Sequence, residues 1–212
     1  MKIFTLRDFP AVLIIATVFS TSCVQSVTTA PSNASTGSQS IRNSQDEFVV
    51  NEIPLKLPLS KPKIVVIKSM RRLMLYSDDK LVRRYRVGLG SSPIDDKTKE
   101  GDRRTPEGSF YVFTKNEKSA YYLSLGLSYP NIEDAERGLH DGLINRDQYN
   151  QIVSAVRTRI APPQDTPLGG QIYIHGNGSQ NDWTWGCVAL DDKDIRELFD
   201  AVPTGTEVII EH

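Results

Sequence analysis

The residues best suited to chemistry in this chain lie in one segment, from His175 to Cys187, which reads His-Gly-Asn-Gly-Ser-Gln-Asn-Asp-Trp-Thr-Trp-Gly-Cys. Cysteine catalysis needs a thiolate, and a nearby imidazole can remove the thiol proton. It also needs backbone N–H groups that point at the oxyanion formed on the attacked carbonyl. Gly186 directly precedes Cys187 and allows close backbone approach because it has no Cβ. The pattern predicts Cys187 as a nucleophile and His175 as its base.

Other interpretations of single residues stay open. A buried cysteine also behaves as a small hydrophobic residue, so Cys187 alone does not decide between packing and catalysis. A lone histidine is more often structural or solvated than catalytic, and we expect this of His140 and His212. One Cys and one His leave a metal site short of ligands, and no second Cys or paired His completes it. We therefore expect neither a metal nor a cofactor.

Short strands are predicted to position the two candidate residues. From Lys61 onward, β-branched and aromatic runs alternate with polar turns, which is typical of a mostly β domain. The strands that we expect span residues 63–68, 73–76, 83–89, 109–114, 121–127, 171–174 and 207–210. Residues 77–80 have the composition of a hairpin turn, and residues 91–104 form a polar loop. The run that ends at Ile174 would hold His175 at a fixed strand end.

Three segments change to a helical period. The helices that we expect span residues 131–139 and 145–158, and a third begins at Asp191 or Asp192. Asn145 as N-cap, with Gln148 three residues later, forms a start that resembles a capping box. The first two helices form an insertion at about residues 131–160, a kind of segment that often becomes a wall of a substrate cleft. The start of the third helix, near the thiol, would favour the thiolate.

From about Lys63 to Ile210 the chain resembles an L,D-transpeptidase catalytic domain of the YkuD type. The order of features matches: opening strands, a Thr-Pro-x-Gly turn at residues 105–108, a strand ending in His-Gly, a Gly-Cys, and a closing Gly-Thr-x-Val. The family signature ends in Ser or Thr, His, Gly and Cys, and this chain has Thr-Trp-Gly-Cys at residues 184–187. The resemblance implies a mostly β fold with a helical insertion, an L,D-transpeptidase-like β-sandwich.

The resemblance also implies roles for the residues of this segment. Cys187 would be the nucleophile and His175 its base, the N–H groups of Gly186 and Cys187 would bind the oxyanion, and Thr184 and Gly176 would support the site. Members of the family attack the bond between the L-centre of a diamino acid and the terminal D-Ala of a peptidoglycan tetrapeptide stem. An amine of a neighbouring stem peptide then resolves the thioester and gives a 3–3 cross-link. Carbapenems typically acylate members of the family.

Two residues depart from the family pattern. Trp185 replaces the second His of the signature, and Ala189 stands where an Arg or Asn is usual. The gap between His175 and the Thr-Trp-Gly-Cys block is also short. The base is retained, so thiol chemistry is still expected, whereas the flat apolar face of Trp185 would alter substrate binding. The residues that we consider for holding the substrate carboxylate are Arg86, Arg103 and Arg104.

Two alternatives to a transpeptidase are kept. The first is a hydrolase that uses the same Cys187 and His175 pair, either as an L,D-carboxypeptidase or by cutting an existing linkage, because such enzymes share the acyl-enzyme and differ only in what attacks it. The second is a non-catalytic, wall-binding lipoprotein.

Residues 1–23 have the pattern of an export signal. A basic start is followed by an apolar run from Phe9 to Phe19, which is too short to span a bilayer because a spanning helix needs ~20 residues. Small residues then lead into Cys23, as in lipoprotein signals whose cysteine is acylated, although Ser20 and Asp8 depart from that pattern. We expect an exported, periplasmic protein that is anchored to the membrane through lipidated Cys23.

Composition separates the remaining regions and excludes one class of partner. Residues 24–60 read as a flexible tether rich in Ser, Thr, Asn and Gln with a lead-in, and residues 61–212 read as the catalytic domain. With 25 Lys and Arg against 26 Asp and Glu, the formal net charge is -1, so nothing favours nucleic acid as a partner. The chain has 2 cysteines, Cys23 and Cys187, which build no disulfide framework. An unpaired thiol in an exported protein is a liability unless it is buried or used.

Overall fold

The computed structural model describes residues 50–212, so the predicted signal peptide, Cys23 and most of the predicted tether lie outside the described residues. The elements in chain order are β1 (Lys63–Ile67), β2 (Arg72–Ser77), β3 (Lys80–Arg86), β4 (Gly108–Ser119), β5 (Tyr122–Leu127), α2 (Ile132–His140), α3 (Arg146–Arg157), β6 (Tyr173–His175), β7 (Val188–Ala189), α4 (Asp192–Ala201) and β8 (Glu207–Glu211). Within this range, no helix has both the length and the apolar character that crossing a membrane requires.

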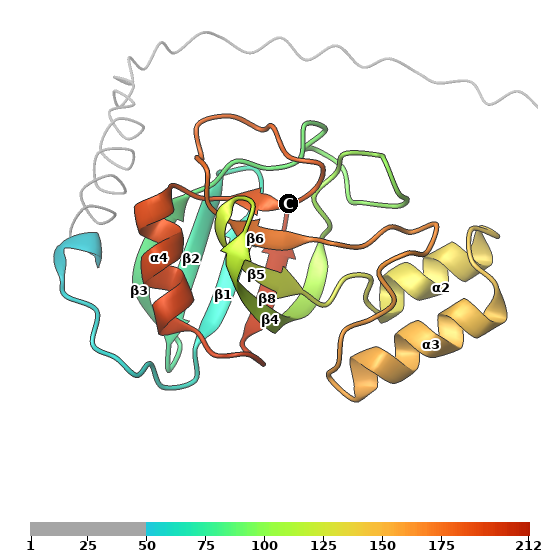
Figure 1. Ribbon diagram of the computed structural model, residues 1–212, viewed down its shortest axis with the longest axis horizontal. Helices are drawn as coiled ribbons and strands as arrows, with labels where there is room; N and C mark the ends of the chain where they lie inside the picture. The colour runs from blue at the N-terminus through green and yellow to red at the C-terminus, as the bar shows by residue number, and fades with distance from the viewer. Residues whose placement is uncertain (1–49) are drawn as a thin grey trace, which may run out of the picture.

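The strands form one curled sheet in the order β3-β2-β1-β8-β4-β5-β6-β7 (Figure 1). The β1–β8 and β6–β7 pairs are parallel, and the other pairs are antiparallel. The first residues of β4 pair with β8, whereas its residues from Val112 onward pair with β5, with a register shift between Val112 and Thr114. This irregularity lets β4 belong to both halves of the sheet. One hydrophobic cluster joins the halves and includes Leu75 of β2 and Leu125 of β5, both fully buried. The predicted mostly β fold is confirmed. The two layers of the predicted β-sandwich are the two halves of one curled sheet.

The helices lie on two sides of this sheet. In α4, Ile195 and Leu198 are fully buried and belong to the main cluster. The other two helices, α2 and α3, pack against each other around a smaller cluster and form the predicted insertion, which projects on the side away from α4 (Figure 1). The Asn145 capping box is present as predicted, because Asn145 and Gln148 exchange side-chain-to-backbone hydrogen bonds. Helix α3 therefore begins where local capping chemistry directs it.

The chain beyond β3 runs alongside the candidate catalytic segment. Strand β3 ends at Arg86 rather than at residue 89, and the next residues form isolated bridges, Gly88 with Ala189 and Gly90 with Thr184. A Cβ on Gly90 would stand 2.2 Å from the backbone oxygen of Arg103, so only glycine fits there. These contacts place the loop of residues 91–104 next to the segment that ends at Cys187.

Candidate active site

Two neighbouring parallel strands bring Cys187 and His175 to the same cavity. His175 is the last residue of β6, and Cys187 directly precedes β7, whose Val188 pairs with Ile174. Both side chains line a cavity of about 420 Å³, together with Tyr121, Lys97 and Trp185 among others. We call this space the thiol cavity. Strand β7 was not predicted from the sequence, because two residues are too few to show a strand pattern.

Hydrogen bonding fixes the tautomer of His175. Its Nδ1 lies 2.8 Å from the carbonyl oxygen of Gly176, and a carbonyl oxygen can only accept, so Nδ1 carries the proton. The Nε2 atom is then the unprotonated nitrogen that can act as a base. His175 is 2% exposed, and this burial lowers the pKa of the imidazole, so the ring is neutral near pH 7. The residue that sequence predicted as the base therefore has the protonation state that a base requires.

Gly176 supports the imidazole through its backbone. Its N–H donates to the carbonyl oxygens of Tyr121 and Leu123, at 3.0 and 3.3 Å, so its own carbonyl is held in place against Nδ1 of His175. A Cβ at this position would lie 2.6 Å from Oδ1 of Asp192. The glycine is needed because the start of α4 packs directly against it.

The thiol of Cys187 is held between backbone groups of the preceding strand segment. Its Sγ accepts from the N–H of Tyr173 at 3.4 Å and lies 3.5 Å from the carbonyl oxygen of Gln171, to which the S–H can donate. Burial raises the pKa of Cys187 to about 11, against the opposing effects of the Tyr173 N–H and of the charge on Lys97. This shift favours a neutral thiol in the resting residue, opposite in direction to the effect expected of a helix start near the thiol.

The hydroxyl of Thr184 stabilises the turn that precedes Cys187. Its buried hydroxyl donates to the carbonyl oxygen of Cys187 at 2.7 Å and accepts from the N–H of Gly186 at 3.1 Å. Gly186 has φ of +131°, and a Cβ there would stand 2.7 Å from the carbonyl oxygen of Arg104. Because the Gly186 N–H already donates to Thr184, it would have to leave that oxygen before it could bind an oxyanion.

An aromatic group that sequence reasoning missed surrounds the imidazole. The ring of Tyr121 stacks on that of His175, with 4.7 Å between centroids and 27° between planes. Trp183 meets the imidazole edge-on at 5.5 Å, and its indole N–H donates to the carbonyl oxygen of Gly178 at 3.1 Å. Trp183 lies inside the singled-out segment, whereas Tyr121 comes from the β4–β5 turn, far away in the sequence. Only the strand pairing of β5 with β6 brings Tyr121 to the site.

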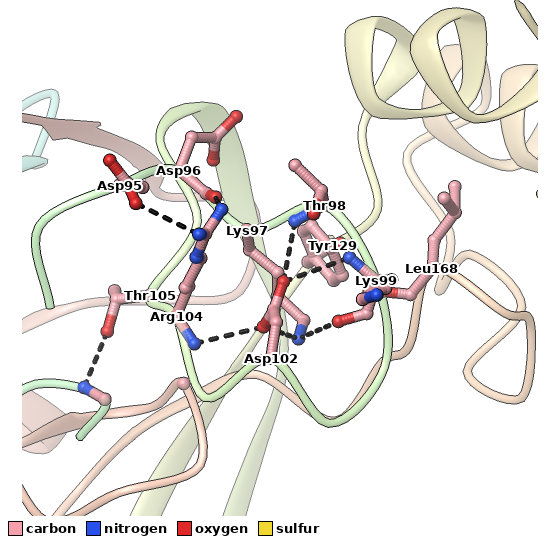
Figure 2. A network of polar contacts seen from close by, with 12 residues as sticks. Asp95, Asp96, Lys97, Thr98, Lys99, Asp102, Arg104, Thr105, Tyr129 and Leu168 are labelled. Carbon is pink, nitrogen blue, oxygen red and sulfur yellow. Dashed lines mark hydrogen bonds and ion pairs between the residues drawn. The ribbon is translucent and has the colours of Figure 1, made fainter. Parts of the chain in front are cut away.

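A second missed feature is the polar cluster that shapes the 91–104 loop (Figure 2). The carboxylate of Asp102 accepts from the N–H groups of Thr98, Lys99 and Arg104, at 2.8, 3.0 and 3.0 Å. The same carboxylate pairs with the buried ammonium of Lys97 at 2.9 Å. Burial alone would raise the pKa of Asp102, but these donors outweigh it and lower that pKa. Acidic and basic residues balance each other within the 91–104 loop, so the amino-acid composition did not indicate a cluster of charges there.

The other residues named in the sequence analysis differ in their contacts and in their distance from the thiol cavity. Trp185, predicted with low weight to contact substrate, lines the thiol cavity and is 67% exposed. Arg86 donates to Gln180, and Arg104 pairs with Asp95 at 3.0 Å. His140 contacts Asp141 and His212 lies 3.5 Å from Glu107, and both histidines are largely exposed. Neither histidine lines the thiol cavity, which agrees with the structural or solvated role expected of both.

Comparison with known proteins gives one family. A model of the L,D-transpeptidase catalytic domain, YkuD, matches residues 61–210. A search of curated protein sequences gave no significant match.

Several solved structures are similar to this chain at low sequence identity. An L,D-transpeptidase from Xylanimonas cellulosilytica is 16% identical, with 79% of this chain and 69% of that one covered and a TM-score of 0.43. The helical cell shape determining protein Pgp2 from Campylobacter jejuni is 21% identical, with 79% and 55% covered and a TM-score of 0.46. The L,D-transpeptidase LdtMt1 in complex with imipenem is 15% identical, with 71% and 58% covered and a TM-score of 0.41. This chain thus spans 55% to 69% of the length of these three proteins.

Proposed function

Because the chain belongs to the L,D-transpeptidase catalytic domain family, we propose that it forms 3–3 cross-links between peptidoglycan stem peptides through a thioester on Cys187. The observation that carries this proposal is the pairing of Cys187 with a neutral His175 in one cavity, where Nδ1 is committed to the Gly176 carbonyl oxygen. That arrangement leaves Nε2 as the base for the thiol.

In the first half of the proposed reaction, Nε2 of His175 takes the proton from Cys187. The Sγ electron pair attacks the carbonyl carbon between the third residue of the stem and the terminal D-Ala, and the oxygen becomes an oxyanion. The N–H groups of Cys187 and of Gly186, the latter after release from Thr184, are the proposed donors to it. The C–N bond then breaks, the imidazolium protonates the leaving amine, and D-Ala departs from the thioester.

In the second half, an amine of a neighbouring stem peptide attacks the thioester carbonyl. His175 takes the proton of that amine and returns it to the departing thiolate, which restores the starting state. The thiol cavity is also lined by Glu100 and Asp165, and two carboxylates favour the binding of a cationic amine, which releases one proton to solvent before it attacks. This lining supports an amine acceptor over water, and so a transpeptidase over the alternative L,D-carboxypeptidase or linkage-cutting hydrolase.

The intact mass of the protein after incubation with a carbapenem tests the nucleophile. We expect a single covalent adduct on the wild-type chain and none on Cys187→Ala, in line with a fold neighbour that binds imipenem. Incubation with a tetrapeptide donor and a stem-peptide acceptor then separates the alternatives. D-Ala release with a joined product supports the transpeptidase, and release with a tripeptide alone supports the hydrolase. Wall-related function that persists in Cys187→Ala would instead support a non-catalytic wall-binding lipoprotein.

A further inference from the structure

The guanidinium of Arg103 is held beside the thiol cavity without a polar partner. Its central carbon lies 4.7 Å from the centre of the Trp185 ring, and Trp185 both lines the cavity and exposes 67% of its surface. Within residues 50–212, the guanidinium has no hydrogen-bond acceptor and no ion-pair partner beyond this aromatic face. Its N–H donors therefore remain available to an anion.

The other cations near the cavity are already neutralised or bonded. Lys97 lines the cavity, but its ammonium donates to Asp102 and to the carbonyl oxygen of Lys99, each at 2.9 Å. Arg104 pairs with Asp95. Of these three cations, and within residues 50–212, Arg103 is the one whose charge is left for a ligand.

The peptide unit that follows Arg103 is held by two hydrogen bonds. Its φ is +59°, a left-handed conformation that is uncommon for a residue with a side chain. The carboxylate of Asp102 holds the N–H of Arg104 at 3.0 Å, and the carbonyl oxygen of Arg103 accepts from Ser92 at 3.0 Å. The Asp102 cluster (Figure 2) therefore holds the backbone directly beside Arg103.

We propose that Arg103, held on the face of Trp185, binds the terminal carboxylate of the donor stem peptide. This inference rests on the proposed function, in which the attacked carbonyl is that of the bond to the terminal D-Ala. Three bonds separate that carbonyl carbon from the D-Ala carboxylate carbon, a span on the order of 4 Å. The carboxylate must therefore bind close to Cys187, and Trp185 is two residues away from it. A guanidinium matches a carboxylate with two parallel donors, and stacking on an indole pre-organises it.

Binding of an intact peptide to Cys187→Ala tests this without requiring turnover. The probes are a tetrapeptide stem that ends in D-Ala and the same peptide with a terminal carboxamide, each titrated by calorimetry. We expect the free acid to bind about tenfold more tightly than the amide, the size of one charge-assisted interaction at a solvated site. This preference should fall to about one in Cys187→Ala/Arg103→Ala, with little change in amide binding.

Arg146→Ala in the same background is the matched control, because Arg146 stacks on Tyr149 at 5.2 Å in the helical insertion and should leave the preference unchanged. Trp185→Leu provides a second variant, in which loss of the stacking face should also reduce the acid preference. Circular dichroism of each variant checks that the fold is retained.

The results separate this inference from the proposed function. D-Ala release by the wild-type chain, with an acid preference that Arg103→Ala and Trp185→Leu leave intact, would overturn the role of Arg103 and keep the transpeptidase. An acid preference that depends on Arg103, without D-Ala release by the wild-type chain, would keep the carboxylate site and overturn the proposed reaction. Failure of both peptides to bind would overturn both.

Discussion

Burial sets the protonation state of both reacting residues. It raises the pKa of Cys187 to about 11 and lowers the pKa of His175, so the resting pair consists of a thiol and an imidazole rather than of two ions. In the proposed reaction, the proton must then move to Nε2 as the sulfur attacks. The carbonyl oxygen of Gly176 is important for this step, because it stabilises the proton on Nδ1 and the imidazolium that forms.

Tyr121 should influence how His175 titrates. The stacked ring excludes water from one face of the imidazole, so Tyr121→Ala should rehydrate it and raise the pKa of His175 toward its ordinary value. The base must be unprotonated to act, so the acid limb of the pH profile of kcat/KM for D-Ala release should move to higher pH. Tyr121→Phe keeps the ring and should keep the wild-type profile. An unchanged acid limb in the Ala variant would contradict this role for Tyr121.

At the scale of elements, the 91–104 loop depends on one buried ion pair. The side chains of Lys97 and Asp102 are 2% and 6% exposed, so Asp102→Asn leaves a buried ammonium without its counter-charge. Breaking a buried pair from one side costs about 3–5 kcal/mol, and we expect a loss of unfolding free energy of that order in urea titrations.

An exposed pair supplies the control for Asp102→Asn. Asp79 pairs with Lys63 at the same 2.9 Å distance, but its side chain is 87% exposed. Asp79→Asn should therefore leave the urea midpoint unchanged. Equal effects of the two substitutions would show that burial does not determine the strength of the pair in the loop.

Helix α2 should respond to pH through Asp134. Burial raises the pKa of this carboxyl to about 7, although the Asn131 N–H and Arg137 oppose the shift. Between roughly pH 4 and pH 7, the folded protein then binds a proton that the unfolded chain has released, so this contribution to stability is full below about pH 4 and is lost as the pH rises through 7. Asp134→Asn should abolish that part of the decline in unfolding free energy measured from pH 4 to pH 8. If the unfolding free energy of the variant fell with pH as steeply as that of the wild type, the decline would come from other groups.

At the scale of the whole molecule, the sequence predicted those features of the fold that depend on the pattern of neighbouring residues. The strand before His175, the Asn145 capping box and the start of α4 at Asp192 all follow from periodicity and capping chemistry. Contacts between distant segments carry no local signal. Tyr121 reaches the imidazole only because β5 pairs with β6.

The upward shift of the Cys187 pKa could not be predicted from sequence patterns either. A helix start near Cys187 is visible in the sequence, but the burial that raises the pKa of this thiol depends on how segments distant in the sequence pack around the sulfur. The pKa of Cys187 is set by the segments that pack around its thiol, and the identity of the residue alone does not predict it.

The position of the protein in the cell is predicted to depend on Cys23, which lies outside the described residues. We expect Cys23→Ala to move the protein from the membrane fraction to the soluble periplasmic fraction, because a lipid chain supplies about 0.8 kcal/mol per buried CH₂. Fractionation and immunoblotting of the two forms would measure this, with Cys187→Ala as the cysteine control that stays at the membrane. Membrane retention of Cys23→Ala would contradict a lipid anchor at this residue.

The neutral state of Cys187 also has a consequence for survival under oxidative stress. Peroxides attack thiolates far faster than thiols, and formation of sulfenic acid follows the thiolate fraction. A sulfur whose pKa is about 11 presents very little thiolate until a substrate occupies the site and His175 takes the proton. In the proposed reaction, the thiol is therefore protected from peroxides until His175 takes its proton, which suits a chain that we expect to be exported.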